Sequence, residues 1–201
     1  VQAAYINDEI RRLRAEYPQI PLYAVIEDVC ASGGYYVASA ADKIYVDKAS
    51  VVGSIGVLMN GFGFTGAMEK LGVERRLITA GENKAFLDPF SPLNTQQEKY
   101  AREMLSDIHG QFIQVVQQGR GKRLKETPDM FTGMVWTGQK SIELGLADAM
   151  GSAEYVAREI IKAEHIVDYT TREGFAERFA RRFGAVTAET LISAGLGWGV
   201  R

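Results

Sequence analysis

The stretch AVIEDVCASGGYY, residues 24–36, decides how this chain begins to fold. The stretch starts with apolar residues that suit a strand. This part ends at Ser32, and two glycines and two tyrosines follow. The residues after this turn, 35–41, have the composition of a helix. A strand, turn and helix in this order expose the serine hydroxyl and leave backbone N–H groups beside it, where they can stabilise a developing oxyanion. Ser32 is therefore a candidate nucleophile, although a serine here is also typical of a helix N-cap.

The composition is that of an ordinary globular protein. The 201 residues suffice for one sizeable domain, and 46% of them are hydrophobic while 24% are charged. The formal net charge of −2 gives no basic excess, so we expect no nucleic-acid partner. The single cysteine, Cys30, excludes an intrachain disulfide, and we expect a small buried residue there rather than a thiol nucleophile.

The first residues have the pattern of a helix that is already under way. Ala3, Ile6, Ile10 and Leu13 have helical spacing, and no capping residue precedes them. The sequence contains no signal peptide and no run of about 18 apolar residues that would span a bilayer. We therefore expect that the natural N-terminus, with any membrane anchor, lies upstream of Val1.

Apolar patterns along the chain alternate between strands and helices. Apolar runs predict strands at 22–26, 43–47, 51–58 and 73–79. Amphipathic periods predict helices that end near Glu16, Gly72, Gly119 and Ala163. The longest helix follows a polar loop at 80–93, has Asn94 as its N-cap and turns Ile108 and Phe112 inward. The alternation predicts an α/β fold with a largely parallel sheet, in a domain that ends at about residue 165.

A serine nucleophile needs a base, and the chain offers few. The two histidines, His109 in the long helix and His165 after the last helix, do not lie in loops that suit an active site. A Ser-His-Asp triad is therefore disfavoured. A lysine can replace histidine when apolar neighbours remove water from it. Lys84 lies in the polar loop and is followed by the apolar residues 85–87, but an ordinary solvated lysine remains an open alternative on these grounds.

Five short motifs, taken together and in this order, resemble one known family. They are ASGGYY at 31–36, ASAADKI at 38–44, VGSIGV at 52–57, VWTG at 135–138 and LGLAD at 144–148. The chain resembles the bacterial signal peptide peptidase A family, the serine-lysine proteases of the Clp protease/crotonase superfamily, over residues 1–165. The resemblance implies a repeated ββα superhelix with a mostly parallel sheet, here without its first strands.

The resemblance also implies roles for individual residues. Ser32 matches the nucleophile, and Lys84, which follows it by 52 residues, matches the general base. Ser54 falls at the position of a serine that hydrogen-bonds the lysine amine. Gly33 supplies one oxyanion N–H, while the family's second donor comes from a turn upstream of Val1. Removing one such donor costs about 10²–10³ in rate.

The implied reaction is acyl transfer through an acyl-enzyme on Ser32, with no cofactor and no metal. The implied substrates are remnant signal peptides and other hydrophobic peptides, bound extended along residues 52–57 with Gly53, Ile55 and Val57 beside them. The implied location is the bacterial cell envelope, with a parent protein anchored in the inner membrane and its catalytic domain facing the periplasm or the exterior. Family members form dome-shaped rings, in which the serine and the lysine can come from adjacent protomers.

The last residues, 166–201, lie beyond the motifs. Phe175, Phe179 and Phe183 recur beside arginines and predict a basic amphipathic helix. We expect it to pack on the fold or a neighbouring subunit, and contact with an anionic membrane is the alternative. Residues 191–195, LISAG, look like a signal-peptide remnant that can occupy a neighbour's groove.

Two other functions stay open at this stage. A crotonase-like acyl-CoA enzyme would use Glu27 or Asp28 as its acid or base and would need neither Ser32 nor Lys84. A non-catalytic subunit would only assemble into the ring.

Overall fold

The computed structural model describes residues 1–163 and 165–170. The chain divides into two compact units, Val1–Lys162 and Ala163–Arg201. The predicted tail helix around Phe179 and the segment 191–195 lie outside the described residues.

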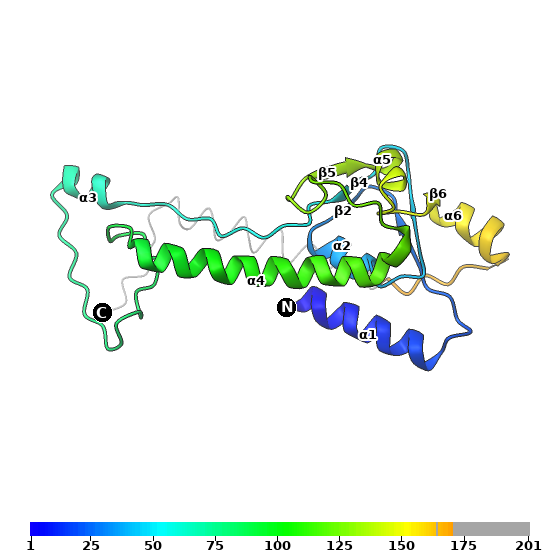
Figure 1. The fold of residues 1–201 in the computed structure, drawn as a ribbon, viewed down its shortest axis with the longest axis horizontal. Coiled ribbons are helices and arrows are strands. Elements are labelled where there is room, and N and C mark those ends of the chain that lie inside the picture. Colours follow the sequence, from blue (N-terminus) through cyan, green and yellow to red (C-terminus); the bar gives the residue numbers. More distant parts are fainter. Residues whose placement is uncertain (164, 171–201) are drawn as a thin grey trace, which may run out of the picture. The chain divides into compact units, whose positions relative to one another are not determined.

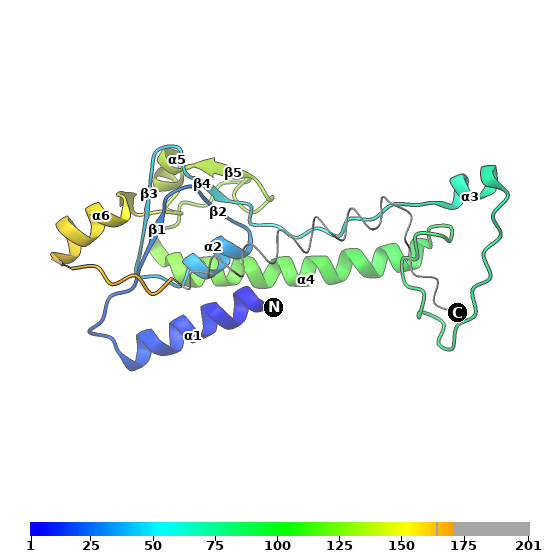
Figure 2. The same ribbon diagram turned by 180° about the vertical axis from the view of Figure 1, so that it is seen from behind.

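Two small sheets lie together toward one end of the first unit (Figures 1 and 2). One holds β1 (Tyr23–Ile26), β3 (Lys43–Val46) and β6 (Ala149–Met150), all parallel and in that order. The other holds β2 (Val29–Ala31), β4 (Val51–Gly53) and β5 (Val135–Thr137), where β2 and β4 are parallel and β5 is antiparallel. This confirms the predicted α/β class with mostly parallel sheets.

The strands follow a repeating order along the chain. β1 and β2 come in succession and lead into α2 (Gly33–Ala38). β3 and β4 then add one strand to each sheet, so that Tyr23 pairs with Lys43 and Val29 pairs with Val51. Each pass of the chain thus contributes one strand to each sheet, as the expected ββα repeat requires.

The other helices lie beside the sheets or extend away from them. They are α1 (Gln2–Glu16), α3 (Thr65–Leu71), α4 (Thr95–Arg120), the 3₁₀ turn Gly121–Arg123, α5 (Gly138–Glu143) and α6 (Ala153–Tyr155), which continues as a π-helix over Val156–Ile161. Figure 1 shows α4 extending past the sheets in the direction of α3. Among the described residues, none of the helices has the length and apolarity needed to cross a lipid bilayer.

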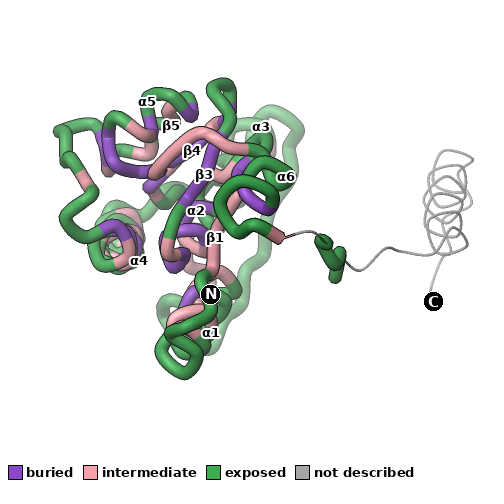
Figure 3. Tube along the Cα trace, turned by 90° about the vertical axis from the view of Figure 1, so that its right-hand side faces the viewer, coloured by how far each residue is buried: buried purple, intermediate pink, exposed green. Residues whose placement is uncertain are grey.

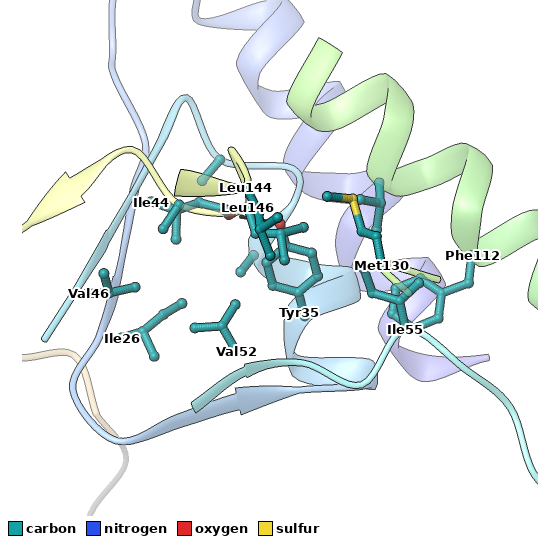
Figure 4. Packing of buried hydrophobic residues seen from close by; sticks show 14 residues of the cluster. Ile26, Tyr35, Ile44, Val46, Val52, Ile55, Phe112, Met130, Leu144 and Leu146 are labelled. Carbon is teal, nitrogen blue, oxygen red and sulfur yellow. Dashed lines mark hydrogen bonds between the residues drawn. The ribbon is translucent and has the colours of Figure 1, made fainter. Parts of the chain in front are cut away.

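The core lies between the two sheets, α2 and the second half of α4 (Figures 3 and 4). Tyr35, Ile44 and Ile55 are fully buried there, and the Tyr35 hydroxyl donates a hydrogen bond to the Leu146 carbonyl at 2.8 Å. Tyr35 and Tyr36 belong to α2, so the core fixes the helix that follows Ser32. The Tyr36 ring packs on Phe112 of α4 at 5.1 Å between ring centroids.

Several sequence predictions are wrong where a segment leaves the core. The predicted strand 51–58 ends at Gly53, and the strand predicted at 73–79 is absent from the structure described for this region. Ile78 is 95% exposed, because no described strand lies beside it to form a ladder. Phe112 is buried as predicted, but Ile108 is 44% exposed, because α4 has already passed beyond the sheets at that point.

Candidate active site

Ser32 forms a strained turn between β2 and α2. Its φ of 51° and ψ of −121° are uncommon for a residue with a side chain. The Ser32 N–H donates to the Gly53 carbonyl at 2.8 Å, and the Ser32 carbonyl accepts from the Tyr36 N–H at 2.9 Å. The turn is thus held on both sides while the residue itself is exposed. This is the backbone arrangement that presents a nucleophilic serine at the end of a strand.

The first turn of α2 places backbone donors beside the Ser32 hydroxyl. Gly33 and Gly34 are exposed, and the N–H groups of a first helical turn have no partner within the helix. Among the described residues, neither these two N–H groups nor the hydroxyl of Ser32 takes part in a hydrogen bond. The turn therefore presents a free hydroxyl and free donors together.

The structure brings Ser54 to the same edge of the sheet as Ser32. Ala31 and Gly53 are paired residues of the parallel strands β2 and β4, and each serine comes directly after its strand. Neighbouring strands lie about 4.8 Å apart, so the two backbones are adjacent. Ser54 also has a positive φ, of 53°, and its N–H donates to the Met134 carbonyl at 2.7 Å. The predicted nucleophile and the predicted lysine-binding serine are therefore neighbours.

Gly53 sets the path into Ser54. Its φ is 115°, and a Cβ there would stand 2.9 Å from the Met134 carbonyl oxygen and 3.0 Å from Cδ1 of Trp136. No side chain fits this space without moving β5. β5 therefore shapes the site, a role that was not predicted although the motif at 135–138 is a sequence signal for it.

The other two predicted substrate-binding residues differ in exposure. The Ile55 side chain is fully buried in the core, so it cannot contact a peptide. Val57 is 36% exposed and lies where the chain leaves the core. Any contact of this segment with an extended peptide would therefore be made through backbone groups first and through Val57 second.

Lys84 is not brought to Ser32 within one chain. It is exposed, and its loop is attached to the start of α4, where the Leu87 N–H donates to Oε1 of Gln97 at 3.0 Å. The helix of Ser32 packs instead on Phe112, which is fifteen residues further along α4, or about 22 Å. Within the described residues, the Lys84 ammonium has neither a hydrogen bond nor an ion pair.

The other candidate bases and nucleophiles lie elsewhere. Nε2 of His109 is 3.1 Å from the Ile55 carbonyl oxygen, and His165 is exposed in the second unit. Burial raises the pKa of the Cys30 thiol to about 11, so it stays protonated at neutral pH and is a poor nucleophile. The described residues contain no group of histidine, cysteine and acidic side chains that could hold a metal ion.

Glu27 and Asp28 lie at the wrong end of β2 for the acyl-CoA alternative. They precede the strand, whereas Ser32 and its N–H groups follow it. Asp28 and Ser32 are four positions apart along extended chain, or about 13 Å. Both carboxylates are exposed, so this position gives them no means of acting on a group held beside Gly33.

A separate pocket of about 980 Å³ lies beside the N-terminal half of α4. It is bounded by three pieces of chain: the segment leaving the core, with Met59 and Phe62; the loop after Lys84, with Leu87; and the start of α4, with Ala101 and Leu105. We call residues 57–108 the arm. The pocket belongs to the arm and does not include Ser32 or Ser54.

A strained serine at the carboxyl end of a parallel strand, with free N–H groups beside it, is an arrangement with which serine hydrolases present a nucleophile. The chain belongs to peptidase family S49, whose family model matches residues 14–167.

Individual relatives agree with this family. The chain is 30% identical over 171 residues to the putative signal peptide peptidase SppA of Enterococcus faecium, covering 84% of this chain and 50% of that protein. It is 27% identical over 168 residues to protease 4 of Haemophilus influenzae, covering 83% and 27%. A match of 44% over 151 residues, covering 75% and 20%, is to a Brucella melitensis protein named Na(+)/H(+) antiporter NhaA. The chain thus spans half or less of these relatives.

Solved structures give a weaker likeness. An enoyl-CoA hydratase/isomerase family member is 17% identical, with a TM-score of 0.32 over 94% of this chain and 52% of that chain.

Proposed function

We propose that this chain is the catalytic part of a serine endopeptidase that cleaves remnant signal peptides and other hydrophobic peptides. The observation that carries the proposal is the turn at Ser32, with its φ of 51°, its exposed hydroxyl and its free neighbouring N–H groups. Ser54 lies beside it at the same sheet edge. In this proposal Ser32 is the nucleophile, Lys84 is the general base and Ser54 directs the lysine amine.

The reaction follows from these roles. The neutral amine of Lys84 takes the proton of the Ser32 hydroxyl, and the oxygen attacks the peptide carbonyl. The N–H of Gly33 stabilises the oxyanion that forms. The lysine then gives its proton to the leaving amine, and the C–N bond breaks to leave an acyl-enzyme. Water, deprotonated by the same lysine, hydrolyses the ester and restores Ser32.

The base is proposed to come from a second copy of the chain. A lysine acts as a base at neutral pH only when burial disfavours its charged form. Lys84 is exposed, and its loop is bonded to the first turn of α4. A single chain therefore gives it neither burial nor contact with Ser32. A homo-oligomeric ring that seats the arm of one protomer on its neighbour would supply both.

The peptide is proposed to bind along the segment that follows β4. Ladder pairing ends at Gly53, and although Gly56 lies against the backbone of Gly133, residues 57 and 58 have no strand beside them in the structure that is described. Such a segment can pair with an extended peptide, because main-chain hydrogen bonds give affinity without requiring a fixed sequence. From the family resemblance, we further propose that the parent protein works in the bacterial cell envelope.

The proposed function is tested by mixing two inactive variants of the full-length protein. Ser32→Ala and Lys84→Ala should each abolish cleavage of a fluorogenic hydrophobic peptide. Equal amounts of the two variants are then dissociated, mixed and reassembled. If the dyad joins two protomers, the mixed ring should recover about one quarter of the parent activity, because random assembly places an intact serine beside an intact lysine at that frequency.

The outcomes separate the alternatives. Cleavage that survives in both single variants contradicts the dyad. Hydrolysis of an acyl-CoA that survives Ser32→Ala supports the crotonase-like enzyme instead. An assembled parent ring with no activity on any peptide supports a non-catalytic subunit. Lys70→Ala, in the last turn of α3, serves as the matched lysine control and should keep the parent activity.

A further inference from the structure

A histidine of α4 forms a hydrogen bond with the chain segment that follows Ser54. Nε2 of His109 lies 3.1 Å from the carbonyl oxygen of Ile55, and the two residues are 54 positions apart in the sequence. A carbonyl oxygen can only accept, so Nε2 carries the proton and donates it. The bond therefore ties α4 to the segment that leaves β4.

This segment has few other attachments. Gly53 is the last residue of β4 that pairs with its neighbours, and the Ser54 N–H adds one bond to Met134. Ile55 is then held twice, by its buried side chain and by the bond from His109. Gly56 lies against the backbone of Gly133, and its N–H donates to the Ser54 carbonyl at 2.9 Å. Figure 4 shows the Ile55 side chain beside Phe112 and Met130. From Val57 onward the residues up to Phe64 are exposed, and within the described structure no hydrogen bond returns them to the core.

α4 leaves the core at the same level. Phe112 and Val116 are buried in the core, whereas Ile108 is 44% exposed and Leu105 already lines the pocket of the arm. The two chain pieces that enter and leave the arm therefore part from the core at Ile55 and at His109. Figures 1 and 2 both show these two pieces continuing in the same direction away from the sheets.

We propose that His109 is a positioning residue for the peptidase reaction. Through the Ile55 carbonyl it fixes the segment Ser54–Val57, along which the peptide is proposed to bind. This inference rests on the proposed function for its kinetic consequence, but the bond itself has a structural consequence that does not depend on any activity.

The structural consequence is tested by hydrogen exchange on the full-length protein. His109→Leu removes the donor at similar volume, and amide exchange of residues 54–56 should become about 5- to 10-fold faster, as expected for one lost neutral hydrogen bond. His109→Gln places an amide donor where Nε2 was and should restore slow exchange. His109→Asn is polar but too short to reach Ile55, and it should exchange like His109→Leu. Gln111→Leu, on an exposed face of α4, is the matched control.

The kinetic consequence is tested with two substrates. For a hydrophobic hexapeptide, His109→Leu and His109→Asn should raise KM about 5- to 10-fold, because the binding segment is no longer held in place. Hydrolysis of p-nitrophenyl acetate, which reaches Ser32 without occupying residues 55–58, should stay within about twofold of the parent. His109→Gln should recover the parent KM.

The proposal is overturned if exchange at 54–56 is unchanged in both His109→Leu and His109→Asn, or if His109→Gln is as impaired as they are. Equal loss on the peptide and on the ester would also overturn it, because that result assigns His109 a general role in folding. A parent protein without peptidase activity would refute the proposed function, while the exchange result would still decide the role of the His109 bond.

Discussion

Gly53 is the residue whose replacement should disturb the site most directly without touching a reacting group. Its positive φ and the 2.9 Å approach of the Met134 oxygen leave no room for a methyl group. We expect Gly53→Ala to lower the free energy of unfolding by about 2 to 3 kcal/mol, since it combines backbone strain with a clash. Activity should fall too, because Ser54 follows at once and the Gly53 carbonyl holds the Ser32 N–H. Urea unfolding and peptide cleavage measure the two effects.

Gly61→Ala is the matched control for this change. Nothing lies within 4 Å of a Cβ at Gly61, and its φ is not positive. Its unfolding free energy should stay within about 0.5 kcal/mol of the parent. A Gly53→Ala protein as stable as Gly61→Ala would contradict the argument from close approach.

Asp148 gives the stability of the fold a dependence on pH. Burial by itself would raise the pKa of this carboxyl, but hydrogen bonds from Arg120 and from the Ile44 N–H, with the charges of Arg120 and Arg123, hold the pKa below its usual value. Stability from a lowered carboxyl pKa is present above the unfolded value of about 4 and is lost as pH falls through the native pKa. The parent protein should therefore lose stability below about pH 4.

Asp148→Asn isolates this contribution. Arg120 is fully buried, so removing its partner at neutral pH should cost about 3 to 5 kcal/mol in unfolding free energy. The difference from the parent should shrink as the pH falls below about 4, where Asp148 takes up a proton first in the unfolded parent and, at lower pH, in the folded parent as well. Glu143→Gln breaks an exposed pair with Lys140 and should cost less than about 1 kcal/mol at any pH. A pH-independent difference would show that charge pairing does not carry the effect.

Among the elements, α4 depends on its first turn to hold the loop of Lys84. Oδ1 of Asn94 accepts from the N–H groups of Gln96 and Gln97 at 2.9 and 3.1 Å, which confirms the predicted N-cap. Gln97 in turn accepts from the Leu87 N–H. Asn94→Ala should cost about 1 kcal/mol locally and fray this turn.

Hydrogen exchange should detect the fraying as faster exchange of residues 87 and 96–98, with no change in β1–β4. Asn94→Asp keeps the cap and should leave exchange as in the parent. Equal exchange in Asn94→Ala and the parent would mean that packing in the arm, not the cap, holds the turn.

Local signals predicted those elements whose cause is local. The cap at Asn94 and the turn at Ser32 depend on residue types within a few positions, and both are where the sequence places them. The prediction of a strand at 73–79 is wrong. An apolar run favours burial, but it does not specify whether the chain is buried by a neighbouring strand or by another surface. The closeness of Ser32 to Ser54 depends on the register between β2 and β4. The sequence implied this register only through its family resemblance.

In the molecule as a whole, the arm has more apolar surface than one chain covers. Large apolar side chains of the arm that are more than half exposed are Leu58, Phe62, Leu71, Val73, Ile78, Leu93 and Tyr100. Exposed apolar surface on this scale is typical of an interaction site. It lies on the part of the chain that carries Lys84, which the proposed reaction needs to reach a serine in another copy.

Ile78→Lys tests whether this surface assembles the active enzyme. Ile78 is 95% exposed, so a lysine there should leave the unfolding free energy of the chain nearly unchanged. It should weaken association, so that sedimentation velocity finds smaller species and specific activity falls steeply on dilution. Ile20→Lys, at an exposed position between α1 and β1, is the matched control and should assemble and cleave as the parent does. A parent that is monomeric and fully active at every concentration would place the base of Ser32 within its own chain.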